Sequence, residues 1–89
     1  KTVLITGCDS GFGNACARQL AAYGFTVVAG CYDINSESAQ ALKSGANNNL
    51  HIVKLDITNE DSIQQALLKI KNVCHGKGLW ALVNNAGVS

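Results

Sequence analysis

Three closely spaced glycines are the residues of this chain whose spacing most clearly indicates chemistry. Gly7, Gly11 and Gly13 lie in the stretch TGCDSGFG, directly after an apolar run at residues 3–5. A strand that runs straight into a helix leaves the first backbone N–H groups of that helix without internal partners, and the helix dipole adds partial positive charge there. Glycines at such a turn let an anion approach the backbone and let the helix pack closely on the strand. The pattern therefore favours binding of a nucleotide or dinucleotide pyrophosphate, and a plain strand-to-helix turn is the alternative.

An acidic residue is expected after the second strand, where it would bond the adenosine ribose. Asp33 lies about 20 residues after Gly13, as this expectation requires. The apolar run before it ends nearer Cys31, so Asp33 either reaches the ribose through a curled chain or is a solvated loop residue. No Arg or Lys occurs from residue 19 to 42, which favours NAD over NADP. No Lys-Ser/Thr pair follows Gly13, so the P-loop pattern of NTP hydrolysis is absent.

Alternating strand and helix patterns would position these residues. Four short apolar runs indicate strands, at residues 2–6, 25–31, 50–57 and 79–84. Continuous apolar runs are typical of parallel strands buried on both faces. Helical patterns separate them, and the alternation implies right-handed crossovers. We therefore expect an α/β fold, a partial Rossmann fold with strand order 3-2-1-4 and helices on both faces. The whole chain, 1–89, is expected to be the N-terminal part of one dinucleotide-binding domain that stops after strand four.

Capping signals set the expected ends of the helices. Asn35 or Ser36 can cap the second helix, which Gly45 closes. The third helix is expected to begin at the capping box Thr58-x-x-Asp61. Its buried face would carry Ile63, Ala66, Leu67, Ile70 and Cys74, and Gly76 and Gly78 would end it.

Composition narrows the function classes. The net charge is +1, only 15% of residues are charged, and there is no basic run, so a nucleic-acid partner is not expected. The four cysteines have no zinc-site spacing, and we expect neither a metal site nor disulfides. They are interpreted as reduced thiols in a reducing intracellular compartment, three of them acting as small hydrophobic residues.

These motifs together resemble the short-chain dehydrogenase/reductase family over essentially the whole chain. The run Thr6-Gly7-x-x-x-Gly11-x-Gly13 is similar to the cofactor-binding glycine motif of that family. The run Asp56-Ile57-Thr58 is similar to the family's acidic residue after strand three, and Asn84-Asn85-Ala86-Gly87 to its N-N-A-G signature after strand four. The segments 7–13 and 78–85 most resemble the branch that holds retinol and hydroxysteroid dehydrogenases and mitochondrial 3-hydroxybutyrate dehydrogenases.

The resemblance implies a role for each matching position. The loop 7–13 would hold the pyrophosphate, and Asp56 would accept a hydrogen bond from the adenine amino group. The segment 85–87 would lie beside the two riboses, and Asn84 would tie neighbouring strands together. An alternative for Asp56 is that it caps the following helix. With Asp33 included, the expected cofactor-binding residues are Gly7, Ser10, Gly11, Phe12, Gly13, Asp33, Asp56, Ile57, Asn85, Ala86 and Gly87.

The resemblance also bears on which dinucleotide binds. Family members that use NADP often carry a basic residue where this chain has Ser10 or Tyr32, and neither is basic here. Members that use NAD often carry Asp where this chain has Cys31. That Asp is missing, so the expected preference for NAD rests on the absence of Lys and Arg at these positions, and Asp33 would take the place of the missing acid.

The catalytic motif of the family is absent from the chain. Members supply a proton from a Tyr-x-x-x-Lys motif, but Tyr23 and Tyr32 are followed four residues later by Val27 and Ser36. We therefore expect no catalytic residue, no turnover by these residues alone, and the cofactor half of an oxidoreductase. The substrate of this oxidoreductase would be an alcohol or carbonyl compound, such as a retinoid or steroid. The parent protein is expected to be a homo-oligomer and to be membrane-associated or mitochondrial.

Two other functions remain open on the same pattern. One is a non-catalytic dinucleotide-binding module, which a downstream Tyr-x-x-x-Lys would exclude. The other is a site for FAD or S-adenosylmethionine, neither of which predicts Asn-Asn-Ala-Gly after strand four.

Overall fold

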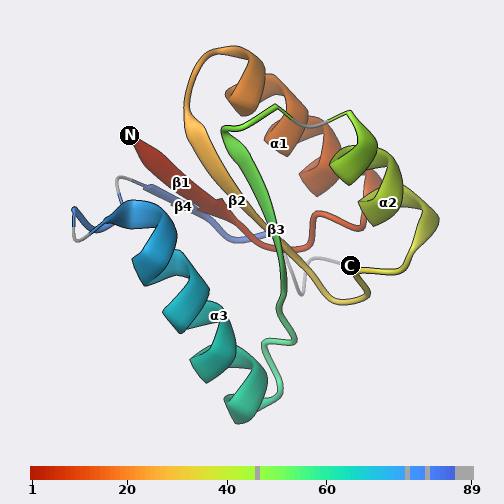
Figure 1. Cartoon of the computed structure of the whole chain (residues 1–89). Coiled ribbons are helices and arrows are strands. Elements are labelled where there is room, and N and C mark those ends of the chain that lie inside the picture. The colour runs from red at the N-terminus through yellow and green to blue at the C-terminus, as the bar shows by residue number, and fades with distance from the viewer. Residues whose placement is uncertain (46, 76, 80, 86–89) are drawn as a thin grey trace.

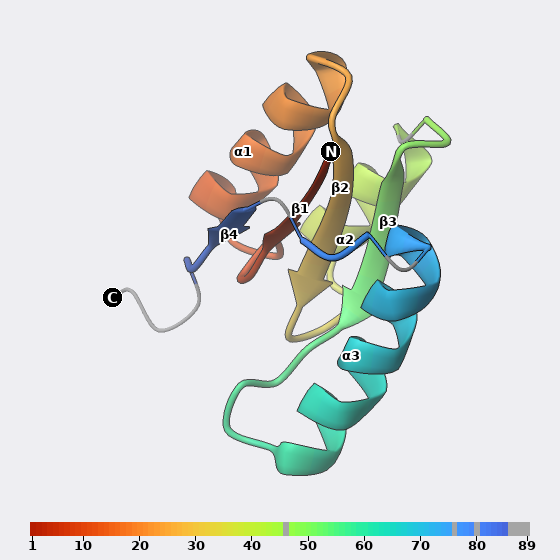
Figure 2. The ribbon, with the colours of Figure 1, turned by 90° about the vertical axis from the view of Figure 1, so that its left-hand side faces the viewer.

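The computed structural model describes residues 1–45, 47–75, 77–79 and 81–85. Strands and helices alternate along the chain, as β1 (Thr2–Ile5), α1 (Gly11–Ala22), β2 (Thr26–Cys31), α2 (Glu37–Ser44), β3 (Leu50–Lys54), α3 (Glu60–Cys74) and β4 (Ala81–Val83). The strands form one parallel sheet in the order β3-β2-β1-β4, which confirms the predicted α/β fold and strand order. Helices α1 and α2 cover one face of the sheet and α3 covers the other (Figure 1). Figure 2 shows β4 as the outer strand beside β1.

Each face of the sheet has its own apolar core, and the two cores explain why the strand sequences are continuously apolar. Along β1, Val3 and Ile5 belong to the core with α1 and α2, whereas Leu4 belongs to the core with α3. The first core also holds Ala17 and Leu42. Because successive strand residues point to opposite faces, burial of both faces requires an apolar residue at every position.

Strands three and four are shorter than predicted. The third strand ends at Lys54 rather than at residue 57, and the fourth covers only Ala81–Val83. Asp56 stops the third strand, because its Oδ1 accepts hydrogen bonds from the backbone N of Thr58 at 3.0 Å and from its hydroxyl at 2.7 Å. An Asp side chain that bonds two residues ahead makes a local turn in place of strand pairing.

The predicted capping box of the third helix is wrong. Asn59 is the N-cap, and its side chain accepts from the backbone N of Ser62 at 3.1 Å. Thr58 lies one residue before the N-cap, and its hydroxyl donates back to Asp56. At the other end, the C-cap is His75, with a left-handed φ of 52°, one residue before the predicted end at Gly76, which lies outside the described residues.

Leu67 is also a correction, because it is 49% exposed rather than buried. The buried residues of α3 are Ala66, Ile70 and Cys74, which recur every four positions, and Leu67 lies one residue off that line. The second helix is capped as predicted, since Ser36 accepts from Ala39 N at 3.1 Å and Gly45 is the C-cap.

The cysteines are free thiols, and three of the four are buried, the number that was predicted: Cys8, Cys31 and Cys74. Burial raises the pKa of Cys8 to about 12 and that of Cys31 to about 11. Within the described part of the chain, no helix has both the length and the apolar character needed to cross a lipid bilayer.

Candidate dinucleotide-binding site

The turn after β1 presents an uncapped helix start. Gly7 has φ of +67°, a left-handed value that lets the chain reverse directly after the strand. Ser10 occupies the N-cap position of α1, but its side chain makes no capping bond and donates instead to the Gly7 carbonyl oxygen at 2.7 Å. The first turn of α1 also contains no acidic residue, whereas α2 and α3 have both a side-chain cap and acidic residues there. The positive end of the α1 dipole is therefore not compensated by the helix's own side chains.

Gly13 fixes the close approach of α1 to this turn. A Cβ added at residue 13 would meet the Gly7 carbonyl oxygen and would lie 2.9 Å from the Gly7 carbonyl carbon and 2.8 Å from Nδ2 of Asn85. Gly11 differs, because a Cβ there would have nothing within 4 Å. Packing thus demands a glycine at residue 13, while residue 11 is open toward its surroundings.

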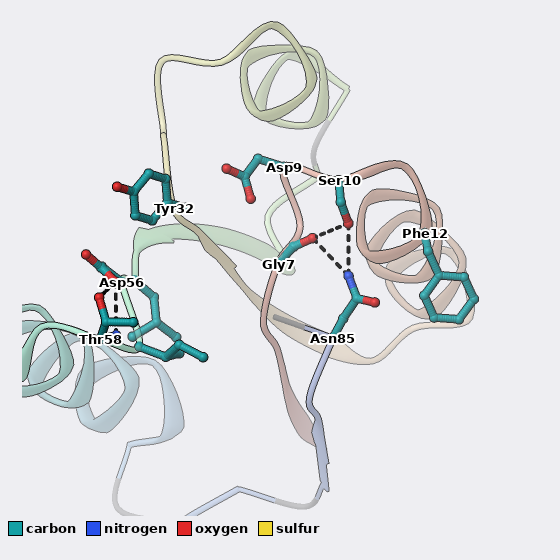
Figure 3. A pocket seen from close by; sticks show the side chains of 10 residues that line it. Gly7, Asp9, Ser10, Phe12, Tyr32, Asp56, Thr58 and Asn85 are labelled. Atoms are coloured by element: carbon teal, nitrogen blue, oxygen red, sulfur yellow. Dashed lines mark hydrogen bonds between the residues drawn. The ribbon is translucent and has the colours of Figure 1, made fainter. Parts of the chain in front are cut away.

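Asn85 ties the end of β4 to the glycine turn. Its Nδ2 donates to the Gly7 carbonyl oxygen at 3.1 Å and to the Ser10 hydroxyl at 2.9 Å (Figure 3). Its backbone N donates to the Thr6 hydroxyl at 2.9 Å, and that hydroxyl donates to Oδ1 of Asn84 at 3.1 Å. Asn84 therefore joins the ends of β1 and β4, as predicted.

One cavity brings most of the predicted site residues together. Its volume is about 700 Å³, within the range of small-molecule sites. It lies at the carboxyl ends of the strands, where parallel α/β sheets bind their ligands. Figure 3 shows Tyr32 and Asp56 across the opening from Asn85 and Phe12. The lining residues are Gly7, Asp9, Ser10, Phe12, Tyr32, Leu55, Asp56, Ile57, Thr58 and Asn85.

Asp56 is held as an ionised acceptor at one end of this cavity. The hydrogen bonds from the Thr58 hydroxyl and backbone lower the pKa of the Asp56 carboxyl below its ordinary value. Its backbone N donates to the Ser62 hydroxyl at 2.9 Å. Because Asn59 caps α3, the alternative of Asp56 as the helix cap does not hold. Ile57 beside it is 45% exposed, so an apolar side chain is available next to the carboxylate.

Asp33 is not among the residues that line the cavity. Its Oδ1 accepts from the backbone N of Asn35 at 2.9 Å, as in a solvated turn, and its own backbone N donates to Oδ2 of Asp9 at 3.0 Å. A ribose contact by Asp33 therefore stays a prediction. Ala86 and Gly87, also predicted to bind the cofactor, lie outside the described residues.

Sequence reasoning missed Asp9 as a member of the site. It lies inside the glycine stretch, and the acidic side chain at that turn was the available signal. Lys54 is not among the lining residues, although its Nζ donates to the carbonyl oxygen of Tyr32, which does line the cavity, at 3.0 Å. Within residues 1–45, 47–75, 77–79 and 81–85, no three His, Cys, Asp or Glu side chains form a set that could hold a metal ion.

A parallel sheet whose carboxyl ends bring a glycine turn, an ionised carboxylate and an asparagine to one cavity defines the class of dinucleotide-binding α/β domains. The comparisons specify the family. The model of the short chain dehydrogenase family matches residues 1–89, and the chain belongs to that family. The predicted resemblance is thereby confirmed.

The relatives lie in the predicted hydroxysteroid and retinol dehydrogenase branch. The chain is 52% identical over 88 residues to 17-beta-hydroxysteroid dehydrogenase type 6 of Rattus norvegicus, covering 99% of this chain and 27% of that protein. It is 46% identical over 89 residues to retinol dehydrogenase 16 of Homo sapiens, covering 100% of this chain and 27% of that protein. The chain thus spans about a quarter of the length of these curated relatives.

A solved structure supports the same fold. The NADPH-bound carbonyl reductase from chicken fatty liver superposes with a TM-score of 0.87 at 34% identity, covering 99% of this chain and 37% of that chain.

Proposed function

We propose that this chain is the N-terminal, cofactor-holding part of a dehydrogenase that transfers hydride between a nicotinamide dinucleotide and an alcohol or carbonyl compound. The observation that carries the proposal is the uncapped first turn of α1, which opens beside a cavity that Asp56 and Asn85 also line. The first four backbone N–H groups of a helix have no intrahelical acceptor, and leaving them unbonded is unfavourable unless water or an anion accepts from them. A bound pyrophosphate supplies such an anion.

The cavity has the right groups in the right order for a dinucleotide. The pyrophosphate would lie on the first turn of α1, between the two ends of the opening. The adenine would lie toward Asp56 and Ile57, where an ionised carboxylate can accept from its amino group and an exposed apolar side chain can cover the ring. The nicotinamide ribose would approach Ser10 and Asn85, whose side chains bond each other at 2.9 Å.

These residues indicate which part of the reaction the cofactor performs and which part the chain performs. The bound cofactor supplies the hydride chemistry, and this chain binds and orients it. A Tyr-x-x-x-Lys motif does not occur in the chain, so proton transfer to the substrate would come from other residues of the parent protein. Residues 1–89 alone are then expected to bind the cofactor without turnover.

NAD is the proposed cofactor. No Lys or Arg is among the described residues that line the cavity, whereas two carboxylates are, from Asp9 and Asp56. A 2′-phosphate would add about two negative charges to this surface. Free cysteines agree with a parent protein in a reducing compartment. A retinoid or steroid alcohol is the proposed substrate class, on the names of the relatives. A homo-oligomer is the proposed assembly of the parent protein.

The test is equilibrium binding of NADH to the protein that carries this chain, followed by competition. Saturable binding is expected, and ADP should displace NADH far better than adenosine, because the diphosphate occupies the helix start. Oxidation of retinol or a hydroxysteroid with NAD, followed by NADH absorbance, then tests the reaction. Absence of saturable NADH and NADPH binding would overturn the proposal. Binding without turnover of any alcohol or carbonyl would favour a non-catalytic module.

A further inference from the structure

The third strand leaves one edge of the sheet open. Within the described part of the chain, β3 pairs only with β2 and lies on the side of the sheet away from β4 (Figure 2). In a parallel pair, each residue directs its backbone N–H and C=O to one side, and successive residues alternate. The backbone groups of Asn49 and Leu55 bond β2, so the odd-numbered residues of this stretch face β2. The backbone groups of Ile52 and Lys54 therefore point outward from the sheet.

Two hollows flank this open edge, one on each face of the sheet. The larger has a volume of about 450 Å³ and is lined by residues of β3, of α2 and of the loop before α2, among them Leu50. The smaller has a volume of about 290 Å³ and is lined by residues of β3 and α3, among them Val53. Both share Ile52 and Lys69 as lining residues. Successive side chains of a strand added along β3 would enter the two hollows in turn, because strand side chains point to alternate faces.

Basic side chains dominate the charge of both hollows. Lys43, Lys54 and Lys69 line the larger hollow, and Lys69 also lines the smaller one beside His51. The three lysines are exposed, and no Asp or Glu is among the described residues that line either hollow. Lys54 donates to the Tyr32 carbonyl oxygen at 3.0 Å, and its ammonium group has two further N–H donors. The edge is therefore basic in a chain whose net charge is only +1.

This charge discriminates among the possible occupants of the edge. A second copy paired through β3 would bring two sets of the same lysines together, and like charges on paired strands are destabilising. An acidic strand has the opposite charge, and its main chain can also bond the outward groups of β3. Single-stranded nucleic acid brings negative charge too, but it has no alternating N–H and C=O groups to match the edge.

We propose that the open edge of β3 binds an acidic, extended segment of a partner protein, which adds to the sheet as a further strand. The main chain of that segment would bond the outward groups of Ile52 and Lys54, and its acidic side chains would pair with the lysines. A segment of about five residues matches the length of β3. No residue lines both these hollows and the dinucleotide cavity, so the inference is independent of the proposed function.

The experiment measures peptide binding to the protein that carries this chain, by fluorescence anisotropy at low salt. The probe is a short fluorescein-labelled peptide in which Glu alternates with Val. A second peptide has the same sequence with every backbone nitrogen methylated, so it keeps the charge but cannot donate strand hydrogen bonds. A third has Lys in place of Glu. A single-stranded DNA oligonucleotide of similar length tests a nucleic-acid partner.

Charge variants locate the binding on the molecule. Lys43→Gln and Lys69→Gln each remove one charge from the hollows. Lys71→Gln removes one charge from α3 outside both hollows and serves as the matched control. All three side chains are exposed, so the variants should fold, which circular dichroism checks.

We expect saturable binding of the acidic peptide and binding at least about tenfold weaker for its methylated form, which loses several hydrogen bonds. Lys43→Gln and Lys69→Gln should each weaken binding about two- to fivefold, the range of an exposed charge pair, and together about five- to twentyfold. Lys71→Gln should change it by less than about twofold. Added salt should weaken binding, because the charges are exposed.

Four results would overturn the inference. Equal binding of the methylated and unmodified peptides excludes strand addition. A loss in Lys71→Gln as large as that in Lys69→Gln places the contact elsewhere. Tighter binding of the oligonucleotide than of the acidic peptide identifies a nucleic-acid surface instead. If the acidic peptide does not bind saturably, or binds no better than the Lys peptide, the lysines only oppose self-pairing of the edge.

Discussion

Gly13→Ala is the substitution whose effect follows most directly from the geometry of the glycine turn. The added Cβ would meet the Gly7 carbonyl oxygen, with the Gly7 carbonyl carbon at 2.9 Å and Asn85 Nδ2 at 2.8 Å. Two of these atoms belong to the backbone, so side-chain rotation cannot relieve the overlap and α1 must move away from the turn. Overpacking costs about 1–3 kcal/mol, and we expect a loss of that size in the free energy of unfolding measured by urea denaturation.

The same displacement should weaken cofactor binding. The amide groups of the first turn of α1 would shift relative to the carboxyl end of β1, so the diphosphate would lose its hydrogen-bond geometry. We expect NADH affinity, measured by fluorescence titration, to fall about ten- to a hundredfold, since each 1.4 kcal/mol is a factor of about ten.

Gly11→Ala is the matched control for Gly13→Ala. It adds the same methyl group to the same helical turn, where nothing lies within 4 Å. The free energy of unfolding should stay the same or rise by about 0.4–1 kcal/mol, because alanine restricts the unfolded chain. NADH binding should weaken, because the added methyl group lies on the open first turn where the diphosphate is expected, but the loss of stability expected for Gly13→Ala should not occur. A Gly13→Ala protein as stable as the unmutated one, with unchanged NADH affinity, would refute the packing argument.

Three further predictions concern the rest of the site. Asn85→Ala removes the two side-chain hydrogen bonds to the glycine turn and should lower the free energy of unfolding by about 1–2 kcal/mol in urea denaturation. Thr58→Val removes the hydroxyl that bonds Asp56, so the pKa of Asp56 should rise toward 3.8 in an NMR titration. Because the folded pKa is depressed, the stabilisation is present above the unfolded value of 3.8 and is lost as pH falls through the lower folded value. Finally, Cys8, with its pKa raised to about 12, should react with a disulfide reagent in the folded protein much more slowly than the partly exposed Cys16.

Each of these has a clear contrary result. An unchanged free energy of unfolding in Asn85→Ala would mean that the two side-chain hydrogen bonds from Asn85 to the glycine turn do not stabilise the fold. An Asp56 pKa that does not move in Thr58→Val would assign its depression to another group. Equal reaction rates of the two thiols would show that the first core opens readily.

Much of the fold was predictable because burial of both sheet faces imposes a simple pattern. Val3, Leu4 and Ile5 are all buried, on alternate faces, so the strand appears as an unbroken apolar run. The helix start at the glycine stretch was predictable because Gly7 and Gly13 each meet a local demand, a left-handed φ and a close backbone contact.

The remaining details depend on choices that sequence patterns leave open. Both Thr58 and Asn59 are suitable helix caps, and the structure places the cap at Asn59, whose side chain accepts from the backbone N of Ser62. The hydrogen bonds from Thr58 to Asp56 end β3 although Ile57 continues its apolar pattern. Asp33 has the expected position along the chain, but its carboxylate bonds a neighbouring backbone N–H, and Asp9 faces the cavity instead. Such pairings between loops have no periodic signature.

The most direct measurement of the central claim is the response of backbone amides to cofactor, in an ¹⁵N-labelled sample of the protein that carries this chain. On addition of NADH, the amide resonances of residues 11–13 should shift the most, together with those of residues 56 and 85, and ADP alone should reproduce the shifts at 11–13. Saturable NADH binding that leaves residues 11–13 unchanged would contradict the account, because the diphosphate would then lie away from the start of α1.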